Sequence, residues 1–168
     1  MSELVEKSLV VLKPDAVQRG LVGEIIARFE KVGLKIVAMK MVRPDREMYF
    51  KHYEEIGTMI TRHGEEVFNM NVEYMMTGPV IAMVIEGVEA VTLVRKLVGA
   101  TEPKSAEVGT IRGDFTHMSF AYAHEKGIGV PNLVHASGNA DEAKKEIELW
   151  FPDEAMQEYQ VLSEKYTR

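Results

Sequence analysis

Residues 8–42 decide the fold, and they read SLVVLKPDAVQRGLVGEIIARFEKVGLKIVAMKMV. The segment opens with a short apolar run, residues 8–12, which a nearby proline closes because proline ends a central strand. Apolar residues then recur at spacings of three and four from Leu21 to Val32, and Gly33 follows as a helix stop. Another apolar run comes directly after it. The segment therefore predicts a strand, an amphipathic helix over residues 21–32, and a second strand over residues 34–42.

The second half of the chain repeats this order of elements. The same reasoning predicts a buried strand at residues 80–85, a helix at residues 90–98 that ends at Gly99, a short strand at residues 133–136 and a helix at residues 140–149. A doubled β-α-β unit is the ferredoxin-like arrangement βαββαβ, in which two helices cover one face of a four-stranded antiparallel sheet. We therefore predict an α/β (α+β) fold of this type.

The middle of the chain and two later segments are less regular. Asp45 is placed to cap a helix through the Tyr49 and Tyr53 region, and residues 65–76 predict another helix before a Gly-Pro break. Residues 101–115 and 116–132 have no clear periodicity. Irregular segments of this length in a compact domain are usually functional or mobile.

Length and composition set the class of protein. The chain has 168 residues, 46% of them hydrophobic, so we predict one globular domain over residues 1–168. A net charge of -6 argues against a surface built for nucleic acid. There is no cysteine, no basic and apolar start of a signal peptide, and no apolar run of the roughly 20 residues that a membrane span needs. We predict a cytoplasmic protein without a membrane partner.

Three cations are candidates to hold phosphate, because the chain has no glycine-rich phosphate loop. Lys13 ends the first strand, Arg95 lies on a helix, and Arg112 lies in the loop GTIRGD. Arginine can form bidentate hydrogen bonds to phosphate oxygens, and lysine supplies a compact positive charge. Taken singly, each is more often a solvated surface cation.

His135 stands where a strand passes to a helix, beside small residues that leave it approachable. It could be a nucleophile, a base or a hydrogen-bonded structural residue, and the structural role is the commonest for such a histidine. Glu146 on the next helix could point back and set its tautomer, although by itself it is an ordinary helix glutamate. The other histidines show no paired ligand spacing, so we predict no metal site made by the protein.

Together these blocks resemble the nucleoside diphosphate kinase family over about residues 6–151. The resemblance rests on four separated motifs: Val11-Leu12-Lys13-Pro14-Asp15-Ala16-Val17, Arg19-Gly20-Leu21-Val22-Gly23, Gly109-Thr110-Ile111-Arg112-Gly113-Asp114-Phe115 and Asn132-Leu133-Val134-His135-Ala136-Ser137. The resemblance implies the ferredoxin-like fold, a homo-oligomer that is a hexamer or a tetramer, and Mg²⁺ held mainly through nucleotide phosphates.

The resemblance also implies roles for individual residues. His135 would be the phosphorylated nucleophile, with Ser137 and Glu146 in hydrogen-bonded support. The positions that fall where the family binds phosphates and ribose are Lys13, Tyr53, Arg95, Thr101, Arg112 and Asn132. The implied activity is transfer of the γ-phosphate from a nucleoside triphosphate to a nucleoside diphosphate by a ping-pong mechanism.

Three departures from the family pattern bear on the site. Extra residues near 54–66 leave the base-stacking position at either Val67 or Phe68. Residues 116–131 form a longer connection than usual, a loop insertion that could act as a lid. An acidic residue common after Ser137 in relatives is missing, so the cap of the next helix passes to Asn139 or Asp141.

Two other functions compete with the kinase. The chain could be a nucleotide-binding regulatory protein that kept the fold but lost turnover, although it retains the residues that turnover needs. It could also be a nucleic-acid-binding module, but the acidic charge and the lack of a paired-aromatic sheet motif weigh against that.

Overall fold

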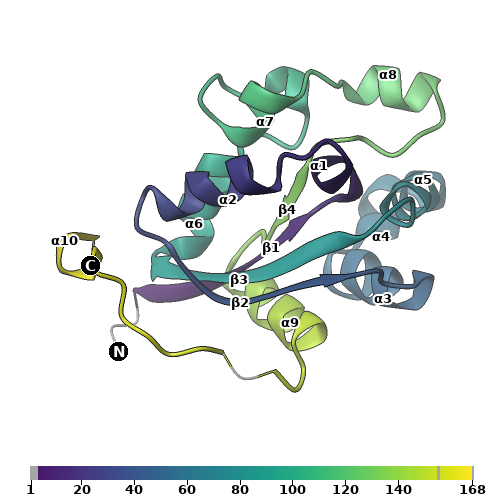
Figure 1. The fold of residues 1–168 in the computed structure, drawn as a ribbon. Coiled ribbons are helices and arrows are strands. Elements are labelled where there is room, and N and C mark those ends of the chain that lie inside the picture. Colours follow the sequence, from purple (N-terminus) through teal and green to yellow (C-terminus); the bar gives the residue numbers. More distant parts are fainter. Residues whose placement is uncertain (1–3, 155, 168) are drawn as a thin grey trace.

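The computed structural model describes residues 4–154 and 156–167; the remaining positions of the predicted domain 1–168 lie outside the described residues. In chain order the elements (Figure 1) are β1 (Val5–Leu12), α1 (Pro14–Gln18), α2 (Val22–Glu30), β2 (Lys35–Val42), α3 (Arg46–Phe50), the π-helix η1 (Lys51–Ile56), α4 (Met59–His63), α5 (Glu65–Met75), β3 (Val80–Val88), α6 (Ala90–Val98), the 3-10 helix η2 (Pro103–Ser105), α7 (Ile111–Phe115), α8 (Phe120–Glu125), β4 (Val134–Ala136), α9 (Ala140–Trp150) and α10 (Glu164–Thr167).

The four strands form one sheet in the order β2-β3-β1-β4, and each neighbouring pair is antiparallel. β1 lies inside the sheet, and its residues from Leu9 to Leu12 are at most 1% exposed. In its pairing with β4, Val11 lies opposite His135 and Leu12 lies opposite Val134. The predicted ferredoxin-like βαββαβ arrangement is confirmed, and this register places His135 beside the end of β1.

Helices cover both faces of this sheet (Figure 1). Successive strand residues point to opposite faces, so Val10 and Leu12 pack with α2 and α6, while Leu9 and Val11 pack with α3, α5 and α9. The prediction that two helices cover one face is confirmed for α2 and α6. The opposite face is covered as well, which explains why β1 reads as a continuous apolar run instead of an alternating one.

Differences from the predicted elements have local causes. The first strand begins at Val5, because Lys7 lies opposite Glu86 in the sheet and pairs with it at 3.4 Å, so charged residues belong to the strand. The aperiodic segments contain η2, α7 and α8, helices of three to six residues that are too short to show a period. The predicted caps are present: Asp45 accepts from the backbone of Met48, and Asn139 caps α9.

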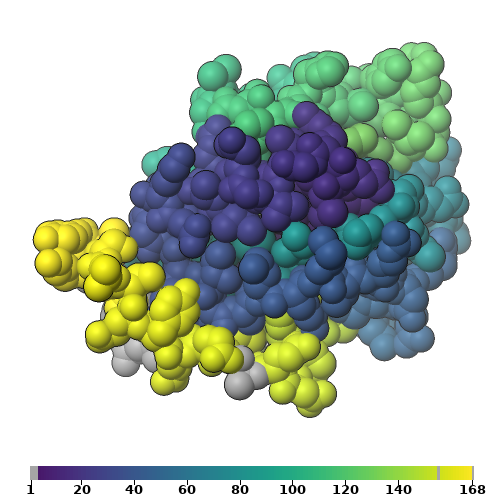
Figure 2. Space-filling view, viewed as in Figure 1, coloured from purple at the N-terminus to yellow at the C-terminus, as the bar shows by residue number. Residues whose placement is uncertain are grey.

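The C-terminal segment runs along the outer strand β2. The backbone N–H of Gln157 donates to the carbonyl of Val37 at 2.8 Å, and the hydroxyl of Tyr159 donates to the carbonyl of Ile36 at 2.7 Å. Figure 2 shows this segment, in yellow, lying across the side of the molecule formed by the dark blue residues. Within residues 4–154 and 156–167, no helix is long and apolar enough to cross a membrane.

Candidate active site

A cavity of about 650 Å³ opens at the end of the sheet where β1 and β4 meet. Its wall is formed by residues from η1, α4, α5, α6, α7, α8, β4 and α9 and from the segments between them. The predicted site residues that line it are Lys13, Tyr53, Val67, Arg95, Thr101, Arg112, Asn132, His135 and Glu146. The fold therefore brings together side chains that are separated by up to 133 positions in the sequence (146 minus 13).

The backbone just before β4 places the histidine. Leu133 is fully buried and has a positive φ of 70°, a conformation that costs free energy for a leucine. Hydrogen bonds hold it on both sides: its carbonyl accepts from the N–H of Lys13 at 2.8 Å, and its N–H donates to the carboxylate of Asp15 at 3.1 Å. The end of β1 thus determines where Asn132 and His135 lie.

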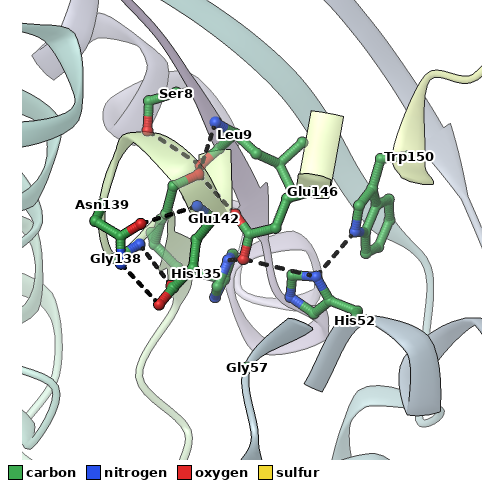
Figure 3. Close-up of polar contacts among 12 residues, drawn as sticks. Ser8, Leu9, His52, Gly57, His135, Gly138, Asn139, Glu142, Glu146 and Trp150 are labelled. Carbon is green, nitrogen blue, oxygen red and sulfur yellow. Dashed lines mark hydrogen bonds and ion pairs between the residues drawn. The ribbon is translucent and has the colours of Figure 1, made fainter. Parts of the chain in front are cut away.

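Glu146 holds the imidazole of His135 from α9 (Figure 3). Its Oε1 lies 2.8 Å from His135 Nε2, and its Oε2 accepts from the hydroxyl of Ser137 at 2.6 Å. Burial alone would raise the pKa of Glu146, but the neighbouring His135, with smaller contributions from His52 and Ser137, lowers it to about 2. The carboxylate is therefore ionised at neutral pH, accepts the proton on Nε2, and leaves Nδ1 of His135 with its lone pair.

Ser137 holds the carboxylate of Glu146 on the side away from the cavity. It is fully buried, does not line the cavity, and its Oγ accepts from the backbone N–H of Leu9 at 3.0 Å. The hydroxyl thus links the carboxylate of Glu146 to the sheet. The predicted supporting role fits this position.

His52 on η1 is a residue that the sequence analysis missed. It is 2% exposed, its ring centroid lies 4.4 Å from that of His135, and its Nδ1 accepts from Trp150 Nε1 at 3.1 Å. Burial, and then the charge of His135, lower the pKa of His52 to about 3, so it is neutral. The only sequence signal was its position three residues after Tyr49 on a predicted helix, which marks a buried face.

Lys13 lies at the cavity floor, where it is 6% exposed. Its Nζ donates to Asn132 Oδ1 at 2.6 Å, and Asn132 in turn donates to the carbonyl of Thr101 at 2.9 Å. Burial, and then the charge of Arg112, lower the pKa of Lys13 to about 7. A cation whose charge is destabilised in this way gains most when an anion arrives.

Arg112 connects three segments around the cavity. Its guanidinium donates to the carbonyls of Gly99, Asn132 and Val134. Burial, and then the charge of Arg95, lower the pKa of Arg112 to about 10, so it stays charged at neutral pH. Arginine has five N–H donors, so two remain for a ligand after these three bonds.

The exposed part of the cavity lining combines apolar side chains, among them Val67, with the polar side chains of Arg62, His63 and His124. Val67 on α5 lines the cavity and is 37% exposed, whereas Phe68 is 3% exposed, belongs to the core on that face of the sheet, and packs edge-on against the ring of Phe50. The alternative of Phe68 as a base contact does not fit this structure, because its ring turns to the side of α5 that faces the sheet. Of the two candidates, only Val67 has a side chain that reaches the cavity.

One group of potential metal ligands lies in the described part of the chain: His52, His135 and Glu146 have ligand atoms within 4.8 Å of one another. These atoms already bond to each other and to Trp150. Mg²⁺ prefers oxygen ligands, so two imidazoles and one carboxylate are a poor set for it. The cationic side chains at the floor can bind phosphate oxygens, and oxygens of this kind are the ligands that Mg²⁺ prefers.

Comparison with known proteins gives consistent matches. The family model described as nucleoside diphosphate kinase matches residues 6–156. The nucleoside diphosphate kinase of Pyrococcus furiosus is 49% identical over 155 residues, which are 92% of this chain and 88% of that protein. A solved structure of the Borrelia burgdorferi enzyme, described as a transition-state mimic with bound vanadate and ADP, has a TM-score of 0.93 at 47% identity and covers 97% of this chain and 96% of its own. The Halobacterium salinarum enzyme in complex with CDP has a TM-score of 0.81 at 36% identity, covering 97% and 98%.

The fold and the cavity define the class: a phosphotransferase built on a ferredoxin-like sheet. The family match runs from β1 to beyond α9, so it includes every element that positions His135, Glu146 and Lys13. The chain belongs to the nucleoside diphosphate kinase family. The resemblance seen in the four sequence motifs is thereby confirmed.

Proposed function

We propose that this chain is a nucleoside diphosphate kinase that moves the γ-phosphate from a nucleoside triphosphate to a nucleoside diphosphate through phosphohistidine at His135. The observation that carries the proposal is the 2.8 Å contact between Glu146 and His135 Nε2 at the floor of a cavity lined by cations. This contact leaves Nδ1 as the nucleophilic nitrogen. An adjacent group that orients and activates a nucleophile is the general requirement of covalent catalysis.

In the first half-reaction, Nδ1 of His135 attacks the γ-phosphorus. The N–P bond forms while the bond from the γ-phosphorus to its bridging oxygen breaks, and the electron pair leaves with the diphosphate. Positive charge develops on the imidazole, and the carboxylate of Glu146 stabilises it through the proton on Nε2. In the second half-reaction, the terminal oxygen of another diphosphate attacks the same phosphorus, and the N–P bond breaks.

Lys13 and Arg112 stabilise the negative charge on the transferred group. Loose phosphoryl-transfer transition states gain mainly from positioning and charge neutralisation. Both cations lie at the floor with His135, and Arg95 adds a further charge on α6. Tyr53, Thr101 and Asn132 line the same cavity and are assigned to the ribose and the phosphates.

Mg²⁺ enters, in this proposal, with the nucleotide and is held mainly by its phosphates, where it would neutralise charge on the phosphate oxygens. The carboxylate of Glu146 and the imidazole of His135 are bonded to each other, which supports that assignment. We further propose that the protein works in the cytoplasm as a homo-oligomer, a hexamer or a tetramer, with no nucleic-acid partner. The net charge of -6 supports the last point.

The range of nucleoside diphosphates that accept phosphate tests the proposed kinase activity. The polar groups that we assign to the phosphates and the ribose, such as Lys13 and Asn132, are mostly buried, and we assign the base to the exposed part of the lining, where Val67 lies. With ATP as donor, we expect several nucleoside diphosphates to act as acceptors, and initial rates to give the parallel double-reciprocal lines of a ping-pong mechanism. Useful rates with one base alone would contradict this view of the mouth, and the absence of any transfer would contradict the proposed function.

Lys13 makes nucleotide binding depend on pH. In the free protein its pKa is about 7, so at pH 8 most molecules carry neutral Lys13. Phosphate oxygens favour the ammonium form and raise this pKa, so binding of ADP takes up about one proton per site at that pH. Affinity therefore falls as the pH rises above about 7, and below it Lys13 is already protonated and adds no dependence.

Calorimetry in buffers of different ionisation enthalpy measures this proton uptake. A Lys13→Met variant should lose the uptake, while Lys96→Met, at an exposed position on α6 outside the cavity lining, should retain it. Equal uptake in Lys13→Met and in the unmodified protein would assign the proton to another group.

A further inference from the structure

Phe120 presents an exposed aromatic ring at the cavity. It begins α8, is 47% exposed, and lines the cavity. Among the residues that the structure describes, it belongs to neither hydrophobic core cluster. An exposed ring at the mouth of a ligand cavity offers apolar surface that a planar group can cover.

The start of α8 is held in place by hydrogen bonds to the chain that follows α6. The backbone N–H of Phe120 donates to Glu102 Oε1 at 3.0 Å, and the N–H of Lys104 donates to the carbonyl of Met118 at 2.9 Å. Ser119 caps the helix by accepting from the N–H of Tyr122 at 3.2 Å. Phe120 is thus presented from a fixed backbone, which lowers the entropy cost of binding against its ring.

The other wall of the mouth comes from α5. Val67 and Met70 line the cavity on this side. The segment after α8 packs closely against the same helix: a Cβ added to Gly129 would lie 2.8 Å from the carbonyl oxygen of Met70. Residues 120–130 and α5 therefore enclose the mouth between them.

We propose that Phe120 supplies the aromatic face on which the nucleotide base stacks, with Val67 on the opposite wall. The inference rests on the proposed function, which places the phosphates at Lys13 and Arg112 and so directs the base to the mouth. Apart from histidines, Tyr53 is the other aromatic side chain in the described cavity lining, but it is 6% exposed and its ring centroid lies 6.2 Å from that of His135, at the floor. The predicted loop insertion at residues 116–131 thereby becomes part of the substrate site.

The test compares a substrate that has a base with one that lacks it. Loss of a stacked aromatic ring weakens binding by about 5-fold to 100-fold. In Phe120→Ala we expect the Kd for ADP, measured by calorimetry, to rise by such a factor. We expect kcat/KM for phosphoenzyme formation from ATP to fall equally, while the value for ribose 5-triphosphate, which has the sugar and phosphates but no base, stays unchanged.

Two further variants separate stacking from a structural role. Tyr122→Ala removes a ring from the same helix that is 51% exposed and does not line the cavity, so its ADP affinity should not change. Phe120→Tyr keeps the aromatic face and should retain the affinity of the unmodified protein. Phe120→Leu keeps an apolar side chain without a ring and should fall between Phe120→Ala and the unmodified protein.

Either of two results would overturn the inference. An unchanged Kd for ADP in Phe120→Ala would show that the base binds elsewhere, and an equal loss with ATP and ribose 5-triphosphate would show that Phe120 acts through the fold. Failure of the proposed function gives a different result: the unmodified protein would form no phosphoenzyme from either donor, while the calorimetric comparison of ADP binding would still report on Phe120.

Discussion

Replacing His135 by alanine should remove the phosphoenzyme and lower turnover by at least about 1,000-fold, because the proposed mechanism forms its covalent intermediate on this imidazole. The unmodified protein, incubated with Mg²⁺ and γ-labelled ATP in the absence of any acceptor, should carry label on His135. Phosphohistidine is a phosphoramidate, so the label should be lost in acid and survive in base, the opposite of an aspartyl phosphate. His52, the other histidine at the floor, is 2% exposed and has its Nδ1 bonded to Trp150, so it should remain unlabelled.

A matched control for this substitution is His117→Ala, at an exposed position outside the cavity lining. It should keep both the label and the rate. Near-normal transfer by a folded His135→Ala protein would exclude the phosphohistidine mechanism. The site of Lys13 and Arg112 would then have to support direct transfer between two bound nucleotides.

The second large effect is expected for Glu146→Gln, which should keep the label but slow transfer by on the order of 10-fold to 1,000-fold. Glutamine preserves the size of the side chain but removes the charge that stabilises the imidazole as it becomes positive. Because the pKa of Glu146 is about 2, this charge is present throughout the neutral range. The loss should appear mainly in kcat, since Glu146 acts on the reacting histidine and has no assigned contact with the base or ribose.

Single-turnover measurement of phosphoenzyme formation reports this step directly. Glu148→Gln, an exposed carboxylate on the same helix, is the control and should leave the rate unchanged. The order of the effects is also diagnostic, since Glu146→Gln must be less severe than His135→Ala. A full rate in Glu146→Gln would mean that the 2.8 Å contact orients nothing that transfer requires.

Local sequence patterns predicted most of the fold. Apolar spacings of three and four placed α2 and α6, apolar runs placed β1, β2, β3 and β4, and two β-α-β units implied the antiparallel sheet. Short helices such as α8 escaped prediction because fewer than two turns carry no detectable period. The same locality explains the predicted caps, Asp45 and Asn139, since a cap bonds to a backbone group three residues away.

By itself, then, the sequence determined the order of the elements, the family through its four motifs, and the residue types available for phosphate transfer. Only the tertiary structure decided which of them meet. The contact of His135 with Glu146, the bond between His52 and Trp150, and the placement of Val67 but not Phe68 in the cavity wall depend on strand register and on which helix face turns to the sheet. These are long-range contacts with no repeating spacing in the chain, so no local pattern encodes them. The position of Phe120 in the cavity wall is also set by long-range contacts, because hydrogen bonds hold the start of α8 against the segment after α6.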